Sequence, residues 1–117
     1  MNLINFYLEE NLYVMNLSEI KSKEIMLGYH GKMVHSETMS WVFWDVEKDA
    51  KVPEHHHFNE QIMHVVEGSF EFTVGGKTDI YKPGDVVIVP SNIPHSGKAL
   101  TACKLMDIFS PAREEYK

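Results

Sequence analysis

Histidine side chains are concentrated in one short segment, because four of the seven histidines lie within residues 55–64. Imidazole nitrogen is a common ligand of divalent transition metals, so this density points to metal coordination. In an extended strand, successive side chains alternate between the two faces. His55 and His57 therefore share one face, whereas His56 points away from it. Two imidazoles on one face supply half of a metal site.

The same alternation decides which neighbours face this pair of histidines. Carried forward along the strand, it places Gln61 and Met63 on the ligand side. Glu60, Ile62 and His64 then face the other way. We therefore predict Gln61, rather than Glu60, as the next ligand, and we expect Met63 to contact a bound substrate.

A further ligand must come from a distant part of the chain, and His95 is the best candidate. It follows the turn of residues 90–94, whose prolines restrict the direction of the imidazole. Three neutral imidazoles and one amide oxygen leave most of the charge of a divalent cation uncompensated, which makes the cation a Lewis acid with open positions. We predict one divalent transition metal (Zn, Ni, Mn or Fe) held by His55, His57, Gln61 and His95.

Each of these signals has a simpler explanation when it is taken alone. A run of three histidines can be an exposed strand end, and a histidine after a proline is often a hydrogen-bonded turn residue. The shared face and the strand pattern described next together favour the metal site. The remaining histidines, His30, His35 and His64, are expected to have ordinary structural roles.

The elements that must position these ligands are predicted to be β-strands. From Met39 onward, short runs of β-branched and aromatic residues alternate with turn signals, which is typical of all-β folds. The turn signals are Glu67-Gly68, Gly75-Gly76 and Pro83-Gly84. Strands are predicted over residues 39–46, 61–66, 69–74, 85–89 and 101–109, with shorter pieces at residues 77–81 and around His95.

The chain is predicted to form one domain with three parts. Residues 1–38 are expected to form an N-terminal arm and the first strands, residues 39–110 the barrel core, and residues 111–117 a C-terminal tail. Residues 17–27 fit a strand or a short helix equally well. The apolar residues 6–8 form an arm that either packs on a second subunit of a homodimer or covers an edge of its own barrel.

Composition and charge exclude several classes of function. A chain of 117 residues fits a single domain. The net charge of -6 and the lack of a Lys/Arg cluster disfavour nucleic acid and anionic lipid as partners. The lone cysteine, Cys103, is expected to be a buried, reduced thiol, which favours a cytoplasmic location. Residues 1–17 do not resemble a signal peptide, and no apolar run reaches the roughly 18 residues of a membrane span.

The proposed ligands also fall at the spacing of the two sequence motifs of the cupin superfamily, which the chain resembles over residues 39–109. The first motif is matched by His55, His57, Gln61 and Gly68. The second motif is matched by Gly84, Pro90 and His95. The chain departs from the motifs at Asp49, Gln61, Asn92 and Ala99. The resemblance implies an all-β, double-stranded β-helix (jelly-roll) barrel with the metal inside its wide end.

Residues 95–100 and 107–116 resemble, more narrowly, the KdgF family of small cupins. This resemblance implies linearisation of the unsaturated monouronates released from pectin or alginate, by ring opening to an open-chain keto sugar acid. It also implies that Asp107, Phe109 and Arg113 face this small anionic substrate beside the metal.

The residue pattern agrees in part with these roles. In a strand over residues 101–109, Asp107 and Phe109 share the apolar face of the strand, where a carboxylate is costly without a partner or a function. The planar guanidinium of Arg113 suits a substrate carboxylate. We predict Asp107 as general acid/base, Arg113 as its catalytic and substrate-binding partner, and Phe109 as part of the substrate wall. The alternative is that Asp107 and Arg113 pair with each other or cap the barrel.

Two other functions fit the same ligands. Three histidines suit an Fe(II) dioxygenase, since they leave room for oxygen and an organic substrate. A barrel of this size can also capture a sugar or a small acid without changing it chemically.

Overall fold

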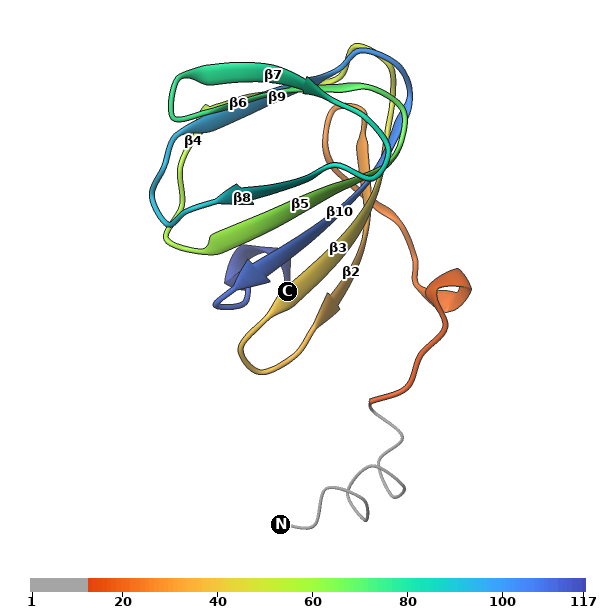
Figure 1. Cartoon of the computed structure of the whole chain (residues 1–117). Helices are drawn as coiled ribbons and strands as arrows, with labels where there is room; N and C mark the ends of the chain where they lie inside the picture. The colour runs from red at the N-terminus through yellow and green to blue at the C-terminus, as the bar shows by residue number, and fades with distance from the viewer. Residues whose placement is uncertain (1–12) are drawn as a thin grey trace.

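Two antiparallel β-sheets face each other and enclose the hydrophobic core (Figure 1). The structure is a computed structural model that describes residues 13–117. The larger sheet contains, in spatial order, β1 (Lys23–Met26), β2 (Tyr29–His35), β3 (Ser40–Val46), β10 (Cys103–Ser110), β5 (Glu60–Glu67) and β8 (Val86–Val89). The smaller sheet contains β4 (Lys51–His55), β9 (His95–Ala99), β6 (Phe70–Val74) and β7 (Lys77–Tyr81). The predicted all-β jelly-roll fold is confirmed.

All the strands predicted from Met39 onward are present, as β3, β5, β6, β7, β8, β9 and β10. Residues 17–27 contain both alternatives, because the 3-10 helix η1 (Leu17–Glu19) precedes β1. The pattern did not single out β2 or β4, which carry Gly31 and Pro53, and both residue types are disfavoured in strands. Pro53 is tolerated because β4 is an edge strand of its sheet. Residues 6–8 lie outside the described residues.

The alternation of side chains buries one face of each sheet. On β3, Val42, Trp44 and Val46 point inward and are at most 3% exposed. On β10, Cys103 and Leu105 point inward in the same way, and the Cys103 thiol is free and buried. These two strands pair along their whole length, so their inward residues form a continuous layer of the core. Among residues 13–117, no helix is long and apolar enough to cross a membrane.

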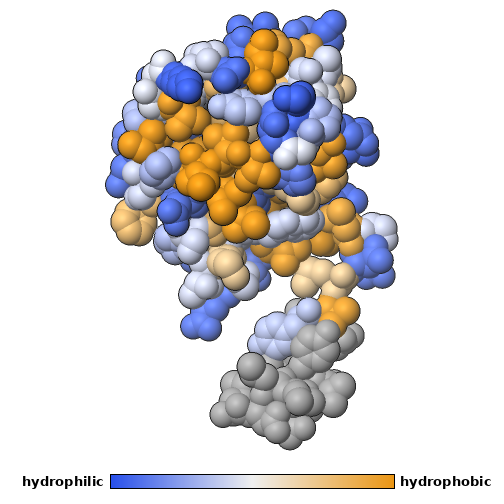
Figure 2. Space-filling view, viewed as in Figure 1, coloured by the Kyte–Doolittle hydropathy of each residue, from blue (hydrophilic) through white to orange (hydrophobic). Residues whose placement is uncertain are grey.

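The outward face of the larger sheet carries the residues that this alternation turns away from the core. Ile62 on β5 pairs with Ile88 on β8 and with Ile108 on β10, and all three are more than 40% exposed. Figure 2 shows apolar side chains gathered on this side of the molecule. Ile62 therefore faces away from the ligand side, as the sequence pattern predicts, whereas its neighbours Gln61 and Met63 are buried.

Gly68, in the predicted turn between β5 and β6, has a positive φ of 88°. A Cβ at this position would collide with the Ala102 carbonyl oxygen and lie 2.8 Å from Cys103 Sγ. Gly76 has a similar φ of 81° but no heavy atom within 4 Å of its Cβ position. We expect Gly68→Ala to lower the free energy of unfolding by about 3 kcal/mol and Gly76→Ala by only about 1 kcal/mol, measured by urea denaturation. Equal losses would mean that backbone strain alone constrains Gly68.

Candidate metal centre

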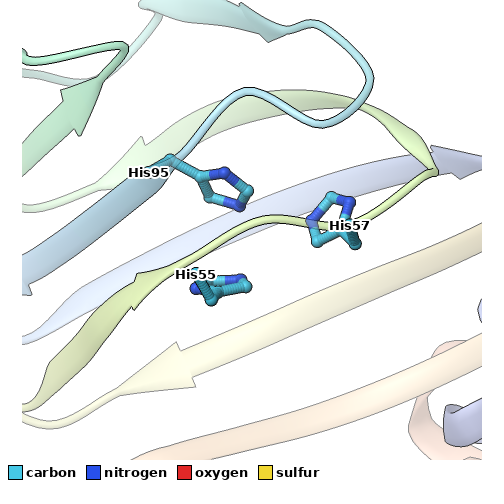
Figure 3. Close-up of side chains that lie close together, drawn as sticks. All are labelled: His55, His57 and His95. Carbon is cyan, nitrogen blue, oxygen red and sulfur yellow. The ribbon is translucent and has the colours of Figure 1, made fainter.

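Three histidines from two segments converge inside the barrel (Figure 3). His55 ends β4, His57 lies in the loop that follows, and His95 begins β9. The β4–β9 pairing places His55 directly opposite His95, with ring centroids 4.3 Å apart, and the His57 ring lies 4.8 Å from that of His95. One ligand nitrogen from each ring lies within 4.8 Å of the other two. The structure therefore brings together the three histidines that the sequence predicts.

Each of the three rings is oriented by a main-chain carbonyl. The Nδ1 atoms of His55, His57 and His95 lie 3.0, 2.8 and 2.8 Å from carbonyl oxygens of Pro53, Asn59 and Ile93, respectively. A carbonyl only accepts hydrogen bonds, so each Nδ1 carries the proton and each Nε2 keeps its lone pair. This is the arrangement of metal-binding histidines, whose second nitrogen usually donates to a carbonyl or a carboxylate.

Two of the three free lone pairs are buried and unpaired. Among residues 13–117, the buried side-chain nitrogens without a hydrogen-bond partner are Nε2 of His57 and Nε2 of His95. Burial and, to a smaller extent, the neighbouring His55 and His57 rings lower the pKa of His95 to about 4. Burial, followed by the nearby Arg113, also lowers the pKa of His57. The His57 and His95 rings are therefore neutral at neutral pH, and a divalent cation fits the site because it would satisfy their unpaired nitrogens.

Gln61 lies beside the triad, on the inward face of β5, and is 6% exposed. Its Nε2 donates to Asp107 Oδ1 at 2.9 Å. A carboxylate only accepts hydrogen bonds, so the amide nitrogen must face Asp107 and the amide oxygen is left for another partner. The Gln61 side chain also interacts with His57 and raises the pKa of that ring, against the larger effect of burial. Asp107 therefore determines which end of this amide is available to the histidines.

Asp107 is buried on β10 between two donors. Its second oxygen, Oδ2, accepts a hydrogen bond of 2.9 Å from Trp44 Nε1 on the neighbouring strand β3. Burial raises the pKa of Asp107 to about 6, and the hydrogen bonds from Gln61 and Trp44 act in the opposite direction. A carboxyl with such a pKa can both take and give a proton near neutral pH.

Arg113 reaches the same cavity from the C-terminal tail. Its guanidinium carbon lies 4.7 Å from the ring centre of Phe109 and 4.4 Å from that of Tyr116. Its Nε pairs with the carboxylate of Glu115. Within the part of the chain that the structure describes, no ion pair joins Arg113 to Asp107, so the two residues do not simply neutralise each other as the alternative from the sequence supposed.

These residues line one cavity, which holds about 480 Å³ of space when the open solvent at its mouth is included. The lining includes His55, Gln61, Met63, His95, Asp107, Phe109 and Arg113. The cavity therefore combines imidazoles and a carboxylate with apolar walls and the guanidinium of Arg113.

Among the residues that line this cavity, Trp44 and Tyr116 were not assigned to the site from the sequence pattern. Trp44 was detectable, because it lies in phase with the inward positions of its strand and a buried indole usually finds a hydrogen-bond acceptor. Tyr116 carried no such signal. It reaches the cavity because the short 3-10 helix η2 (Glu114–Tyr116) turns the tail back towards the Trp44 ring, 6.3 Å away.

Two antiparallel sheets that enclose three convergent histidines define this chain as a jelly-roll β-barrel protein with a candidate metal site. A family model described as the cupin domain matches residues 42–109, more than half of the chain. The protein is therefore a member of the cupin family, and its His55/His57/His95 cluster is a candidate site for a divalent metal.

Similar solved structures support the assignment. An RmlC-like cupin from Shewanella frigidimarina is 28% identical, with a TM-score of 0.86 over 90% of this chain and 96% of that one. KdgF from Halomonas sp. is 27% identical, with a TM-score of 0.81 over 86% of this chain and 94% of that one. An oxalate decarboxylase variant from Bacillus subtilis, 20% identical with a TM-score of 0.74 over 83% of this chain and 29% of that one, shares the fold. No curated protein sequence matches the chain.

Proposed function

We propose that this protein is a metal-dependent enzyme that opens the ring of unsaturated monouronates derived from pectin or alginate. The observation that carries the proposal is that a buried carboxyl, an arginine and the imidazoles of His55 and His95 line one cavity, with the His57 ring beside that of His95. The similarity to KdgF from Halomonas, at 27% identity over most of both chains, supports the same substrate class. So does the resemblance of the C-terminal sequence to the KdgF family.

The reaction is an isomerisation whose proton balance requires an acid/base. The bond between the ring oxygen and the anomeric carbon breaks, and the anomeric hydroxyl loses its proton to become an aldehyde. The resulting enolate takes up a proton at the adjacent alkene carbon and becomes a ketone. One proton therefore leaves oxygen and one arrives at carbon, with no oxidant or water consumed.

The residues of the cavity match these requirements. Asp107, with a pKa raised to about 6, takes the hydroxyl proton and returns a proton to carbon. Arg113 pairs with the substrate carboxylate, and Phe109 and Met63 form the apolar wall. Bound by His55, His57, His95 and Gln61, a divalent cation would supply Lewis-acid polarisation of a substrate oxygen.

An assay without oxygen tests the proposal. Unsaturated monouronates made by a polysaccharide lyase are mixed with metal-loaded, untagged protein, and the loss of ultraviolet absorbance of the conjugated alkene is followed. We expect the absorbance to fall faster than in protein-free buffer, with the open-chain keto acid as the product seen by NMR. Turnover only in the presence of oxygen would indicate a dioxygenase, and saturable binding without turnover a sugar-acid binding protein.

A further inference from the structure

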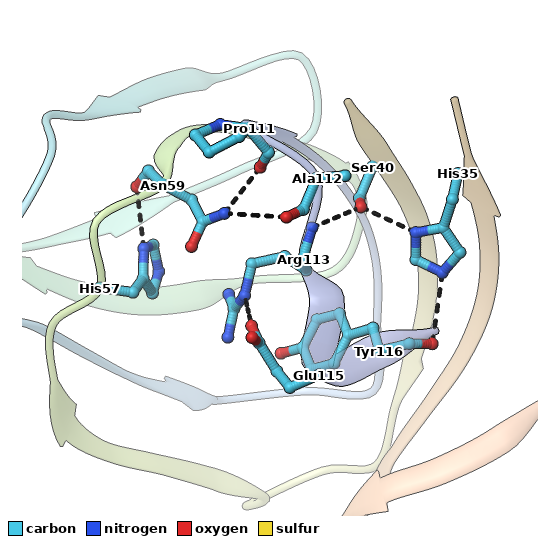
Figure 4. A network of polar contacts seen from close by, with 9 residues as sticks. All are labelled: His35, Ser40, His57, Asn59, Pro111, Ala112, Arg113, Glu115 and Tyr116. Carbon is cyan, nitrogen blue, oxygen red and sulfur yellow. Dashed lines mark hydrogen bonds and ion pairs between the residues drawn. The ribbon is translucent and has the colours of Figure 1, made fainter. Parts of the chain in front are cut away.

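One loop residue, Asn59, contacts both the metal centre and the C-terminal tail (Figure 4). Its main-chain carbonyl accepts the 2.8 Å hydrogen bond from His57 Nδ1. Its side-chain amide nitrogen donates to the carbonyl oxygens of Pro111 at 2.6 Å and Ala112 at 3.4 Å. The two carbonyls immediately precede Arg113, so a single residue lies between a metal-binding histidine and the arginine of the cavity.

The other side of the tail is held by a chain of hydrogen bonds that begins at Arg113. The Arg113 main-chain N–H donates to Ser40 Oγ at 2.7 Å. Ser40 Oγ lies 2.8 Å from His35 Nδ1, and His35 Nε2 lies 3.2 Å from the Tyr116 carbonyl oxygen. Because that carbonyl accepts only, Nε2 carries the His35 proton and Nδ1 accepts from the Ser40 hydroxyl. Every donor in this chain has an acceptor, so the tail has one preferred position on β2 and β3.

The Arg113 side chain has little freedom once the tail is fixed. Its guanidinium is stacked between the rings of Phe109 and Tyr116, and Glu115 pairs with its Nε. The side chain is only 10% exposed. The position of the tail backbone therefore sets how far the free edge of the guanidinium lies from the histidines.

We propose that Asn59 is a positioning residue that sets the spacing between the histidine triad and Arg113. This spacing makes the site selective for a substrate whose carboxylate lies at a matching distance from the substrate oxygens that bind the metal. The role rests on the proposed function, in which Arg113 binds that carboxylate. Asn59 acts through its side-chain amide on the tail and through its main chain on His57. A change of side chain therefore loosens the tail and leaves the His57 contact in place.

The variant Asn59→Leu separates these two contacts, because leucine has a similar size but no side-chain donor. We expect KM for an unsaturated monouronate to rise roughly tenfold while kcat stays within about twofold, since substrate placement is lost and the proton-transfer groups are untouched. Metal affinity, measured by titration with Co²⁺, stays unchanged. Ser91→Ala is the matched control: it removes a 2.6 Å hydrogen bond to the Phe58 carbonyl in the same region, and we expect wild-type values of KM.

Limited digestion with trypsin tests the positioning role without any substrate. Arg113 is 8% exposed, so cleavage after it requires the tail to detach. Release of the peptide 114–117, followed by mass spectrometry, is expected to be about tenfold faster in Asn59→Leu than in the wild type and in Ser91→Ala, provided that thermal unfolding shows all three folded.

The two measurements distinguish failure of this inference from failure of the proposed function. A wild-type protein that does not open uronates removes the proposed function, whereas the digestion still reports whether Asn59 holds the tail. Unchanged digestion in Asn59→Leu overturns the positioning role. So does a loss of Co²⁺ affinity as large as the rise in KM, because Asn59 would then act through His57 and not through the tail.

Discussion

Replacing Asp107 with asparagine is expected to lower kcat for ring opening by about 10²- to 10⁴-fold, the usual contribution of a general acid/base. Asparagine keeps the shape of the side chain but cannot exchange a proton. Turnover is measured with the alkene absorbance assay at saturating substrate. Because Asp107 is fully buried, a thermal melt must show that the variant is folded before its kinetics are interpreted.

The same substitution has a second expected effect, on the metal centre. The new amide nitrogen must face one of the two donors that now bond to Asp107, either Trp44 Nε1 or Gln61 Nε2. The Trp44 indole N–H can only donate a hydrogen bond, whereas the Gln61 amide can rotate so that its oxygen accepts a hydrogen bond from the new amide at position 107. Its NH₂ group then faces the histidines and repels a cation. We therefore expect weaker metal binding, with one ion still held by three imidazoles.

The double variant Asp107→Asn with Gln61→Glu separates the two effects. A carboxylate at position 61 accepts from the amide at position 107 with one oxygen and leaves the other for the metal. Metal affinity should recover to at least the wild-type level, while turnover stays low. Wild-type kcat in the single variant would remove Asp107 from the mechanism, and recovered turnover in the double variant would show that Asp107 acts only by orienting Gln61.

Removing one imidazole, by His95→Ala, is expected to abolish both metal binding and turnover. His95 is the most buried of the three ligands and belongs to the second of the two segments that form the site. In the wild type, metal at about 100 times its dissociation constant should stabilise the fold by about 2.7 kcal/mol, because it binds the folded state alone. The rise in Tm on adding metal to chelator-treated protein measures this stabilisation.

His56→Ala provides the matched control for His95→Ala. His56 lies between two of the ligands in sequence but is exposed and outside the triad. We expect this variant to keep the metal-dependent rise in Tm and the full turnover. A His95→Ala protein with an unchanged rise in Tm would place the metal elsewhere in the molecule. Activity that survives chelation would exclude the metal from the reaction.

The positions of the site residues along their strands were predictable because a strand has a period of two. This period placed Gln61 and Met63 on the inward side of β5, and it placed Asp107 on the same face as Phe109. His57 lies in the loop between β4 and β5, so the strand period that predicted its direction does not apply there. The strands themselves were recognisable from β-branched and aromatic runs between glycine turns. The pattern left β1 undecided between strand and helix, and it did not single out β2 and β4, which contain Gly31 and Pro53.

Other features depended on contacts between segments that are far apart in the chain. The partners of Asp107 are an example, because Trp44 and Gln61 reach it only after β3, β10 and β5 have paired. The contact of Asn59 with the tail is another, since it spans 52 residues. Such hydrogen bonds depend on side-chain rotamers and on strand order, neither of which a local pattern encodes.

By itself, therefore, the sequence determined which side chains face the interior of the barrel and which residue types are available there for binding a metal. Alternation along a strand is a local property of the backbone, so it can be deduced without any partner strand. The tertiary structure alone decided which nitrogen of each histidine is free, which end of Gln61 faces the triad and where Arg113 lies. These properties are set by hydrogen bonds to main-chain and side-chain atoms that only the folded chain brings within reach.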